Sequence, residues 1–292
     1  MSARVVNVSG RDGLAVVARL LQRSRLEHPT DGVWEAADLY WWWRSPRASD
    51  ELAQPVWLDE VGDPVAACMF TEWQDSWTCD PIVLPSRTED LLAVVMAAAG
   101  ERLDAGEVTS DVVMAVPDGD ERWQGLAAQH GFAAGEDRHA VLWMDAAVAP
   151  AITALPDRYV LANRVERAAL AHHFDVKYSG DEQARLAASP LYRRDLDLCV
   201  VEDDGQVAGY GLFWFDPATR VGMVEPMRTE DAHQGRGLAR AILTTGLSRL
   251  VAAGAERLKI SVEVGNAPAE HLYTSVGFVP TRIDTGFVRH LA

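Results

Sequence analysis

A short loop between a predicted strand and a predicted helix carries the residues best suited to chemistry. Residues 229–239 contain two glycines, Gly235 and Gly237, with Arg236 between them. Glycines at such a turn allow consecutive backbone N–H groups to point toward one place, and the helix N-terminus adds roughly half a positive charge there. This combination favours a diphosphate, which Arg236 could also contact. The spacing fits neither the P-loop nor the dinucleotide fingerprint, because both need a different arrangement of glycines.

Two segments around this loop carry a family resemblance. Residues 234–239 fit the acyl-CoA signature Q/R-x-x-G-x-G/A of the GCN5-related N-acetyltransferases (GNAT). Residues 266–278 resemble the family's N…A…LY…GF segment. The resemblance covers residues 157–292, whereas for residues 1–145 it depends on element order alone. The whole chain therefore resembles a tandem two-domain acetyltransferase of the mycothiol synthase type.

The resemblance implies a site for acetyl-CoA and no metal. The pyrophosphate would bind the backbone amides of Gly235, Gly237 and Ala239, and Asn266 would meet the pantetheine arm. The other cofactor-binding residues that it implies are Met227, Arg228, Thr229, Gln234, Arg236, Leu238 and Tyr273.

Two further residues would carry the reaction. The resemblance implies that Tyr273 protonates the leaving CoA thiolate, which makes that thiolate a better leaving group. The attacking amine must lose a proton, and Glu225 on the motif strand is the candidate base. A backbone N–H near Met227 or Arg228 would polarise the thioester carbonyl.

Each of these residues also has a purely structural interpretation. Tyr273 could simply pack as an aromatic helix residue against the sheet. Asn266 could serve as the N-cap of the following helix and make no contact with the cofactor. Glu225 could form a surface ion pair with Arg228 or Arg220. A metal site at the neighbouring histidines 172 and 173 is disfavoured, because adjacent helical residues point in different directions and no further ligands accompany them.

The elements that must position these residues follow a mixed α/β order. Hydrophobic periodicity in the second half predicts strands at 158–163, 195–202, 206–215, 220–229 and 257–264, and helices at 166–174, 181–188, 237–253 and 267–276. Two short strands are predicted for the remainder. Three strands in a meander, followed by helix, strand, helix and strand, predict an α+β mixed sheet flanked by helices.

The first half repeats much of this order. Strands are predicted at 5–8, 56–60, 64–73, 77–84 and 110–116, and helices at 13–23, 35–43, 88–103 and 121–130. An internal duplication explains the repeat. The first copy lacks glycine in the loop before its long helix, at residues 84–89. The sequence therefore predicts a degenerate GNAT-like domain at 1–147 and a catalytic domain at 156–292, joined by an Ala- and Pro-rich linker.

Composition narrows the class of protein. The 292 residues include 27 Lys+Arg and 43 Asp+Glu, a net charge of −16. Residues 1–150 hold 25 acidic and 11 basic residues (net −14), whereas residues 151–292 hold 18 and 16 (net −2). This acidity disfavours binding to nucleic acid or to an anionic membrane. Three cysteines without a CxxC spacing suggest buried thiols in a reducing, cytoplasmic compartment.

The predicted function is transfer of an acetyl group from acetyl-CoA to a primary amine of a small molecule by direct attack. The acidic first half favours a cationic acceptor, and the protein is expected to be a monomer or a homodimer. Two alternatives within the enzyme class are acetylation of a protein or peptide amine and acetylation of a mycothiol-type cysteinyl sugar. A non-catalytic acyl-CoA-binding or regulatory module is the alternative from another class.

Overall fold

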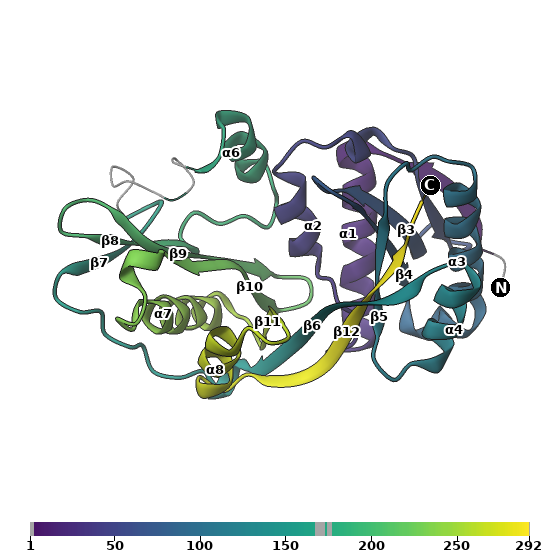
Figure 1. The fold of residues 1–292 in the computed structure, drawn as a ribbon. Helices are drawn as coiled ribbons and strands as arrows, with labels where there is room; N and C mark the ends of the chain where they lie inside the picture. The colour runs from purple at the N-terminus through teal and green to yellow at the C-terminus, as the bar shows by residue number, and fades with distance from the viewer. Residues whose placement is uncertain (1–2, 167–172, 174–176, 292) are drawn as a thin grey trace. The chain divides into compact units, whose positions relative to one another are not determined.

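The computed structural model describes residues 3–166, 173 and 177–291 (Figure 1). These residues form two compact units. The first unit comprises Met1–Leu39, Pro46–Ala140 and Arg282–Ala292, and the second comprises Tyr40–Ser45 and Val141–Thr281. The expected boundaries, 1–147 and 156–292, put a single division near the middle of the chain. The observed units instead each include a segment from the other half, because these segments make their contacts there.

The first unit is a sheet with helices packed against it. Its strands follow the order β1-β2-β3-β4-β5-β12-β6, with the ends of β6 and β12 belonging to the second unit. Helix α1 contacts β3 and β4, α3 also contacts both strands, and α4 contacts β5. The elements of the first half are β1 (Arg4–Val8), α1 (Gly10–Glu27), α2 (Ala36–Trp43), η1 (Ala48–Glu51), β2 (Gln54–Leu58), β3 (Pro64–Glu72), β4 (Trp77–Val83), η2 (Pro85–Arg87), α3 (Thr88–Asp104), β5 (Val112–Pro117), α4 (Glu121–Gln129), β6 (Ala133–Asp145) and η3 (Ala146–Val148).

The second unit repeats this plan. Its strand order is β6-β11-β10-β9-β8-β7, and α7 packs on β8, β9 and β10. In each unit four antiparallel strands precede a helix and a strand that is parallel to the fourth. The elements of the second half are β7 (Tyr159–Asn163), α6 (Gly180–Ala187), β8 (Asp197–Glu202), β9 (Val207–Asp216), β10 (Val221–Thr229), η4 (Asp231–His233), α7 (Leu238–Ala253), β11 (Arg257–Glu263), α8 (Ala267–Ser275) and β12 (Val279–Arg289).

The mixed α/β class predicted from periodicity is confirmed, but two regions differ from the prediction. Residues 133–145 form a strand, β6, where none was expected. The two short strands expected at the C-terminus are one strand of 11 residues, β12. Both strands have exposed outer residues that hide their period. The helix predicted at 166–174 lies almost entirely outside the described residues.

Helix α7 lies directly against the sheet because one of its residues has no side chain. Leu243 and Leu247 are fully buried toward β9, one turn apart. Gly246 lies between them, and a Cβ there would come within 2.0 Å of the Phe213 ring. The close approach therefore requires glycine at this position.

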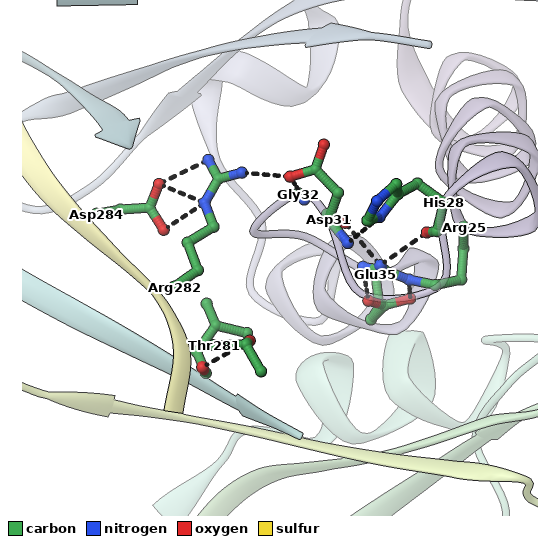
Figure 2. A network of polar contacts seen from close by, with 9 residues as sticks. Arg25, His28, Asp31, Gly32, Glu35, Thr281, Arg282 and Asp284 are labelled. Atoms are coloured by element: carbon green, nitrogen blue, oxygen red, sulfur yellow. Dashed lines mark hydrogen bonds and ion pairs between the residues drawn. The ribbon is translucent and has the colours of Figure 1, made fainter. Parts of the chain in front are cut away.

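A network of polar contacts links the C-terminal segment to a loop of the first unit (Figure 2). Arg282 donates from Nε to Asp284 at 2.8 Å and from Nη1 to Asp31 Oδ1 at 2.9 Å. Arg25, near the end of α1, forms a buried ion pair with Glu35 beyond this loop, and its Nη1 donates to the Asp31 carbonyl oxygen at 2.6 Å. These contacts explain why residues beyond 281 group with the first unit.

The three cysteines are buried thiols, as the sequence suggested. Cys68 on β3 and Cys79 on β4 have their Sγ atoms 3.6 Å apart, although the sequence spacing indicated no partner. Burial raises the pKa of the Cys79 thiol, which keeps it protonated and unreactive. No helix in the described part of the chain has the length and apolar character needed to cross a bilayer.

Candidate active site

The loop between β10 and α7 presents backbone N–H donors that find no acceptor in the described part of the chain. Gly235 and Gly237 have φ values of 73° and 79°, and Gly237 caps α7 in the left-handed conformation. No atom lies within 4 Å of a Cβ built at either glycine, so the conformation rather than crowding requires them. The N–H groups of Gly235, Gly237 and Ala239 have no hydrogen-bond partner among the residues that the structure describes. An anion at this helix terminus would satisfy them.

Arg236 stabilises the loop through hydrogen bonds of its side chain. Its Nη1 donates to Tyr159 Oη at 2.8 Å and its Nη2 donates to the Ala232 carbonyl oxygen at 3.1 Å. Tyr159 Oη lies 3.1 Å from His233 Nδ1, and the buried Glu202 lies 3.7 Å from the same nitrogen. Since Tyr159 accepts from Arg236, its own proton can be donated to His233. The Arg236 guanidinium is therefore engaged by β7, although the sequence suggested a contact with phosphate.

The strands below the loop separate where the sequence predicts the cofactor. Parallel pairing of β10 with β11 joins Val221–Val224 to Arg257–Ile260, although both strands continue beyond it. On its other side β10 stays paired with β9, with an irregularity between Val224 and Met227. Glu225 lies within this irregularity. Met227, Arg228 and Thr229 follow on the separated part of β10.

Glu225 and Tyr273 are close enough to influence each other. Tyr273 on α8 is 8% exposed, and its ring packs edge-on against Phe278 at 6.5 Å. Burial, and secondly the charge of Glu225, raise the pKa of Tyr273 to about 12. The phenol therefore stays protonated at neutral pH and can act as a donor. Glu225 is half-buried, and its carbonyl oxygen accepts from Trp214 Nε1 at 2.7 Å, which fixes the strand at this point.

The ion partners of Arg228 and Arg220 test whether Glu225 merely forms a surface ion pair with one of them. Arg228 pairs with Glu230 at 3.5 Å and with Asp231 at 3.3 Å. Arg220 pairs with Glu256. Neither arginine is therefore committed to Glu225.

Asn266 caps α8, as the alternative interpretation held. Its Oδ1 accepts from the Ala269 N–H at 3.3 Å. Gln234 closes the base of the glycine loop, donating from Nε2 to Asp231 Oδ1 at 3.1 Å. Leu238 is buried beneath the loop as the first residue of α7.

An aromatic and basic cluster also borders this region, and sequence reasoning did not find it as a site. His173 stacks on Tyr210 of β9 with ring centroids 3.2 Å apart, and lies edge-on to Tyr178 at 5.6 Å. Arg44 lies 4.9 Å from the Tyr178 ring centroid. The only sequence signal was the run of three tryptophans that precedes Arg44. His172 is outside the described residues, and within them no group of three or more acidic, His or Cys side chains could hold a metal.

The corresponding loop of the first unit is closed to ligands by its own contacts. Pro85 has no N–H, and the Ser86 N–H donates to Glu27 Oε2 at 3.0 Å. The Arg87 N–H donates to the Leu84 carbonyl oxygen at 2.8 Å. The Glu27 carboxylate thus accepts from the Ser86 N–H, the kind of backbone donor that remains open at Gly235. Sequence reasoning found the missing glycines but not this internal anion.

The first unit also has an acidic residue followed by proline, Asp80-Pro81 on β4, at the place where the second unit has Glu225-Pro226 on β10. Asp80 is 5% exposed and accepts from Trp34 Nε1 at 3.0 Å and from Thr78 Oγ1 at 3.0 Å. Burial raises the pKa of Asp80 to about 6. This carboxyl is occupied by neighbours of its own unit, whereas Glu225 is half-exposed.

Comparison with known proteins supports the resemblance in sequence. Residues 164–278 match the family model described as the acetyltransferase (GNAT) family. The mycothiol acetyltransferase of Beutenbergia cavernae is 36% identical over 87 residues, which are 30% of this chain and 29% of that protein. The mycothiol acetyltransferase of a Nocardioides species is 29% identical over 137 residues, 42% of this chain and 46% of that protein. The chain thus spans less than half the length of these relatives.

Solved structures share the fold of the whole chain. A tandem GNAT protein from the clavulanic acid biosynthesis pathway superposes with a TM-score of 0.70 at 14% identity, covering 99% of this chain and 98% of the other. A GCN5-related N-acetyltransferase from Sphaerobacter thermophilus gives a TM-score of 0.63 at 17% identity, covering 98% and 95%. At such identities the likeness concerns the fold alone. The tandem arrangement expected from the repeated element order is confirmed.

Proposed function

From the GNAT acetyltransferase domain that residues 164–278 form, we propose that the second unit binds acetyl-CoA and transfers its acetyl group to a primary amine of a small molecule. The observation that carries the proposal is the row of unpartnered N–H groups at Gly235, Gly237 and Ala239, directly above the point where β10 leaves β11. These donors suit the pyrophosphate, and the gap between the strands suits the pantetheine arm and thioester.

The reaction is a direct attack that needs two proton transfers. The amine nitrogen bonds to the thioester carbon, and a backbone N–H near Met227 or Arg228 stabilises the oxyanion. Glu225 takes the proton that the amine loses. The C–S bond then breaks, and Tyr273 protonates the CoA sulfur. The products are an N-acetyl amine and free CoA, and solvent returns the proton from Glu225 to Tyr273.

The other assignments of the resemblance become secondary roles. Arg236 would mainly support the loop, because two of its N–H donors already bond Tyr159 Oη and the Ala232 carbonyl oxygen. Asn266 would orient α8 through its cap, and its free amide edge would reach the pantetheine arm. Gln234 and Leu238 would fix the two ends of the glycine loop.

A mycothiol-type acceptor is the second candidate, because the mycothiol acetyltransferases named above are similar to the motif region. Acetylation of a protein or peptide amine and a binding-only role are weaker, since no observation favours them. One assay distinguishes these four candidate functions. It measures the release of free CoA from acetyl-CoA in the presence of a library of small amines, a cysteinyl amino sugar or a peptide. Release with small amines supports the proposal. Saturable acetyl-CoA binding without release from any amine contradicts catalysis and leaves the binding module.

A further inference from the structure

Arg44 is held beside the proposed catalytic groups by a segment from the other half of the sequence. It follows α2 within Tyr40–Ser45, which belongs to the second unit. Its guanidinium carbon lies 3.3 Å from the ring centroid of Trp41, and Nη1 donates to the Trp41 carbonyl oxygen at 2.6 Å. Next to it, Ser45 Oγ donates to Glu182 Oε1 at 2.6 Å, which fixes the end of the segment on α6. The position of Arg44 is therefore set from several sides.

From Arg44 a continuous row of rings leads to the strands of the proposed site. Tyr178 lies between Arg44 and His173, at 4.9 Å and 5.6 Å between the respective centres. His173 stacks on Tyr210, which pairs with Arg228 of β10 in the sheet register. The charge of Glu225 acts on both Tyr210 and Arg44. The cation and the proposed base therefore border the same region of the second unit.

The charge of Arg44 lacks a close counterion. Among the described residues no carboxylate lies within 4 Å of it, and its Nε is buried without a hydrogen-bond partner. Burial lowers the pKa of Arg44, and the contact with the Tyr178 hydroxyl, followed by the charges of Glu182 and Glu225, only partly offsets that effect. By contrast, the buried Arg25 of the first unit is paired directly with Glu35. Holding a partly buried guanidinium without a close counterion is costly, and a bound anion would reduce that cost.

We propose that Arg44 binds a carboxylate of the acceptor while Glu225 faces its amino group, so that the acceptor is a small amino acid-like molecule. The inference rests on the proposed function and specifies its substrate class. A planar guanidinium can hold both oxygens of a carboxylate, and one arginine balances its single charge. A phosphate, with about two negative charges, would need further donors. A zwitterionic acceptor would place its ammonium group near Glu225 and its carboxylate near Arg44.

The test compares linear amino acids, from glycine to 6-aminohexanoate, with their primary amides. The two members of each pair differ only in the carboxylate. A nearby carboxylate also raises the pKa of the amine, which by itself makes the amide more reactive at neutral pH. For the best chain length we expect kcat/KM to favour the acid, and Arg44→Gln to lower kcat/KM for the acid about 10- to 100-fold through KM, with little change for the amide.

The matched control is Arg185→Gln, because Arg185 also lies over a tryptophan ring, 4.1 Å from Trp43, in the same unit. It should leave the preference for the acid intact. Equal or better use of the amides by the parent, or loss of the preference in both variants, overturns the proposal.

A binding measurement keeps the inference separate from the proposed function. In the presence of CoA, titration with the carboxylates acetate to hexanoate should give saturable binding to the parent and at least tenfold weaker binding to Arg44→Gln. If acetyl-CoA binds and no amine is acetylated, the proposed function fails, yet this titration still decides the role of Arg44. Equal carboxylate binding by parent and variant, or none by either, contradicts it.

Discussion

Tyr273 and Glu225 show how the surroundings of a residue select its chemistry. Tyr273 is buried next to a carboxylate, and both effects disfavour the phenolate and raise the pKa to about 12. Such a phenol stays protonated throughout the neutral range. It can donate to a developing thiolate but cannot act as a base. In the proposed reaction, Glu225, half-exposed on the separated part of β10, has the complementary role of accepting a proton.

Replacement of Tyr273 by Phe tests this division of roles. Loss of the donor should lower kcat about 10²- to 10⁴-fold, while the Kd for acetyl-CoA changes less than twofold, because the glycine loop is untouched. Stopped-flow or coupled assays give kcat, and calorimetry gives Kd. Tyr192→Phe is the control, since Tyr192 donates to Asp197 at 2.6 Å elsewhere in the same unit. Equal activity of Tyr273→Phe and the parent would remove Tyr273 from the mechanism.

Asp80 predicts a pH dependence of stability. Its pKa is raised to about 6 in the folded chain, so the folded state binds the proton more tightly than the unfolded state does. The free energy of unfolding should therefore fall as pH rises from about 4 to about 6, by on the order of 3 kcal/mol. Asp80→Asn cannot titrate and should lose less stability over this range. Urea unfolding at pH 4, 5, 6 and 7 measures the difference.

Asp59→Asn should respond in the opposite direction. Hydrogen bonds from the backbone N–H groups of Asp63 and Val61 lower the pKa of Asp59, so its charged form stabilises the fold above the unfolded pKa and this contribution is lost in acid. The variant should be less stable than the parent near pH 7, and the difference should shrink as the pH falls below the unfolded pKa. Identical pH profiles for Asp80→Asn and the parent would contradict the account of Asp80.

Individual site residues differed in how well the sequence predicted them. The glycines and Tyr273 could be found because they lie within short motifs with fixed spacing. Arg44, Tyr178 and Tyr210 could not, since three separate segments bring them together and no local pattern records that. Asn266 and Arg236 were ambiguous in sequence, because capping or bracing uses the same side-chain types as ligand binding.

At the scale of elements, α7 is bounded by two glycines that make a controlled comparison. Gly237 and Gly254 both have left-handed φ values, 79° and 104°, at opposite ends of the helix. Alanine at either position should cost about 1–2 kcal/mol of folding free energy from backbone strain. Gly237→Ala should in addition weaken acetyl-CoA binding tenfold or more, because the new Cβ enters the open space over the unpartnered N–H groups.

Gly254→Ala should leave acetyl-CoA binding unchanged, because that end of α7 faces no proposed ligand. Thermal unfolding and calorimetric titration of both variants separate the two effects. Equal Kd values for the two variants would contradict a pyrophosphate site at the N-terminus of α7.

Most elements followed from hydrophobic periodicity, and the two exceptions share a cause. β6 has seven residues, Ala133–His139, that are exposed or half-exposed, so no apolar alternation marks its first part as a strand. β12 begins with exposed residues and ends in the first unit, where its partner is β5. Such strands are specified by long-range pairing, which a window of local sequence does not contain.

On the scale of the whole molecule, the two halves of the sequence differ both in net charge and in whether the loop before the long helix has open N–H donors. The half with net charge −14 has a closed loop, whereas the half with net charge −2 has an open one. Under the proposed function, the tandem chain has its one cofactor site at the open loop. The sequence predicted the two copies and which of them had lost the loop. It did not predict the exchanged segments, because residues 40–45 and 282–292 carry no signal of which copy they join.

The exchange of segments predicts the behaviour of a fragment cut at the sequence-based boundary. Residues 1–147 alone lack Asp284–Arg289, which pair with all of β5, while β4 pairs with only two residues of that strand. The fragment should therefore unfold at a lower temperature and with less cooperativity than the same fragment carrying residues 282–292 on a flexible linker. Near-ultraviolet circular dichroism follows this through the first unit's tryptophans. Indistinguishable melting curves would show that β12 is dispensable.

The most direct test of the central claim, one acetyl-CoA site at the N-terminus of α7, is an amide-resolved NMR titration of the full chain with acetyl-CoA. We predict saturable shifts of the Gly235, Gly237 and Ala239 amide signals at one equivalent, with the Ser86 and Arg87 signals unchanged. Absence of saturable shifts at Gly235, Gly237 and Ala239, or saturable shifts at Ser86 and Arg87 in their place, would contradict the account.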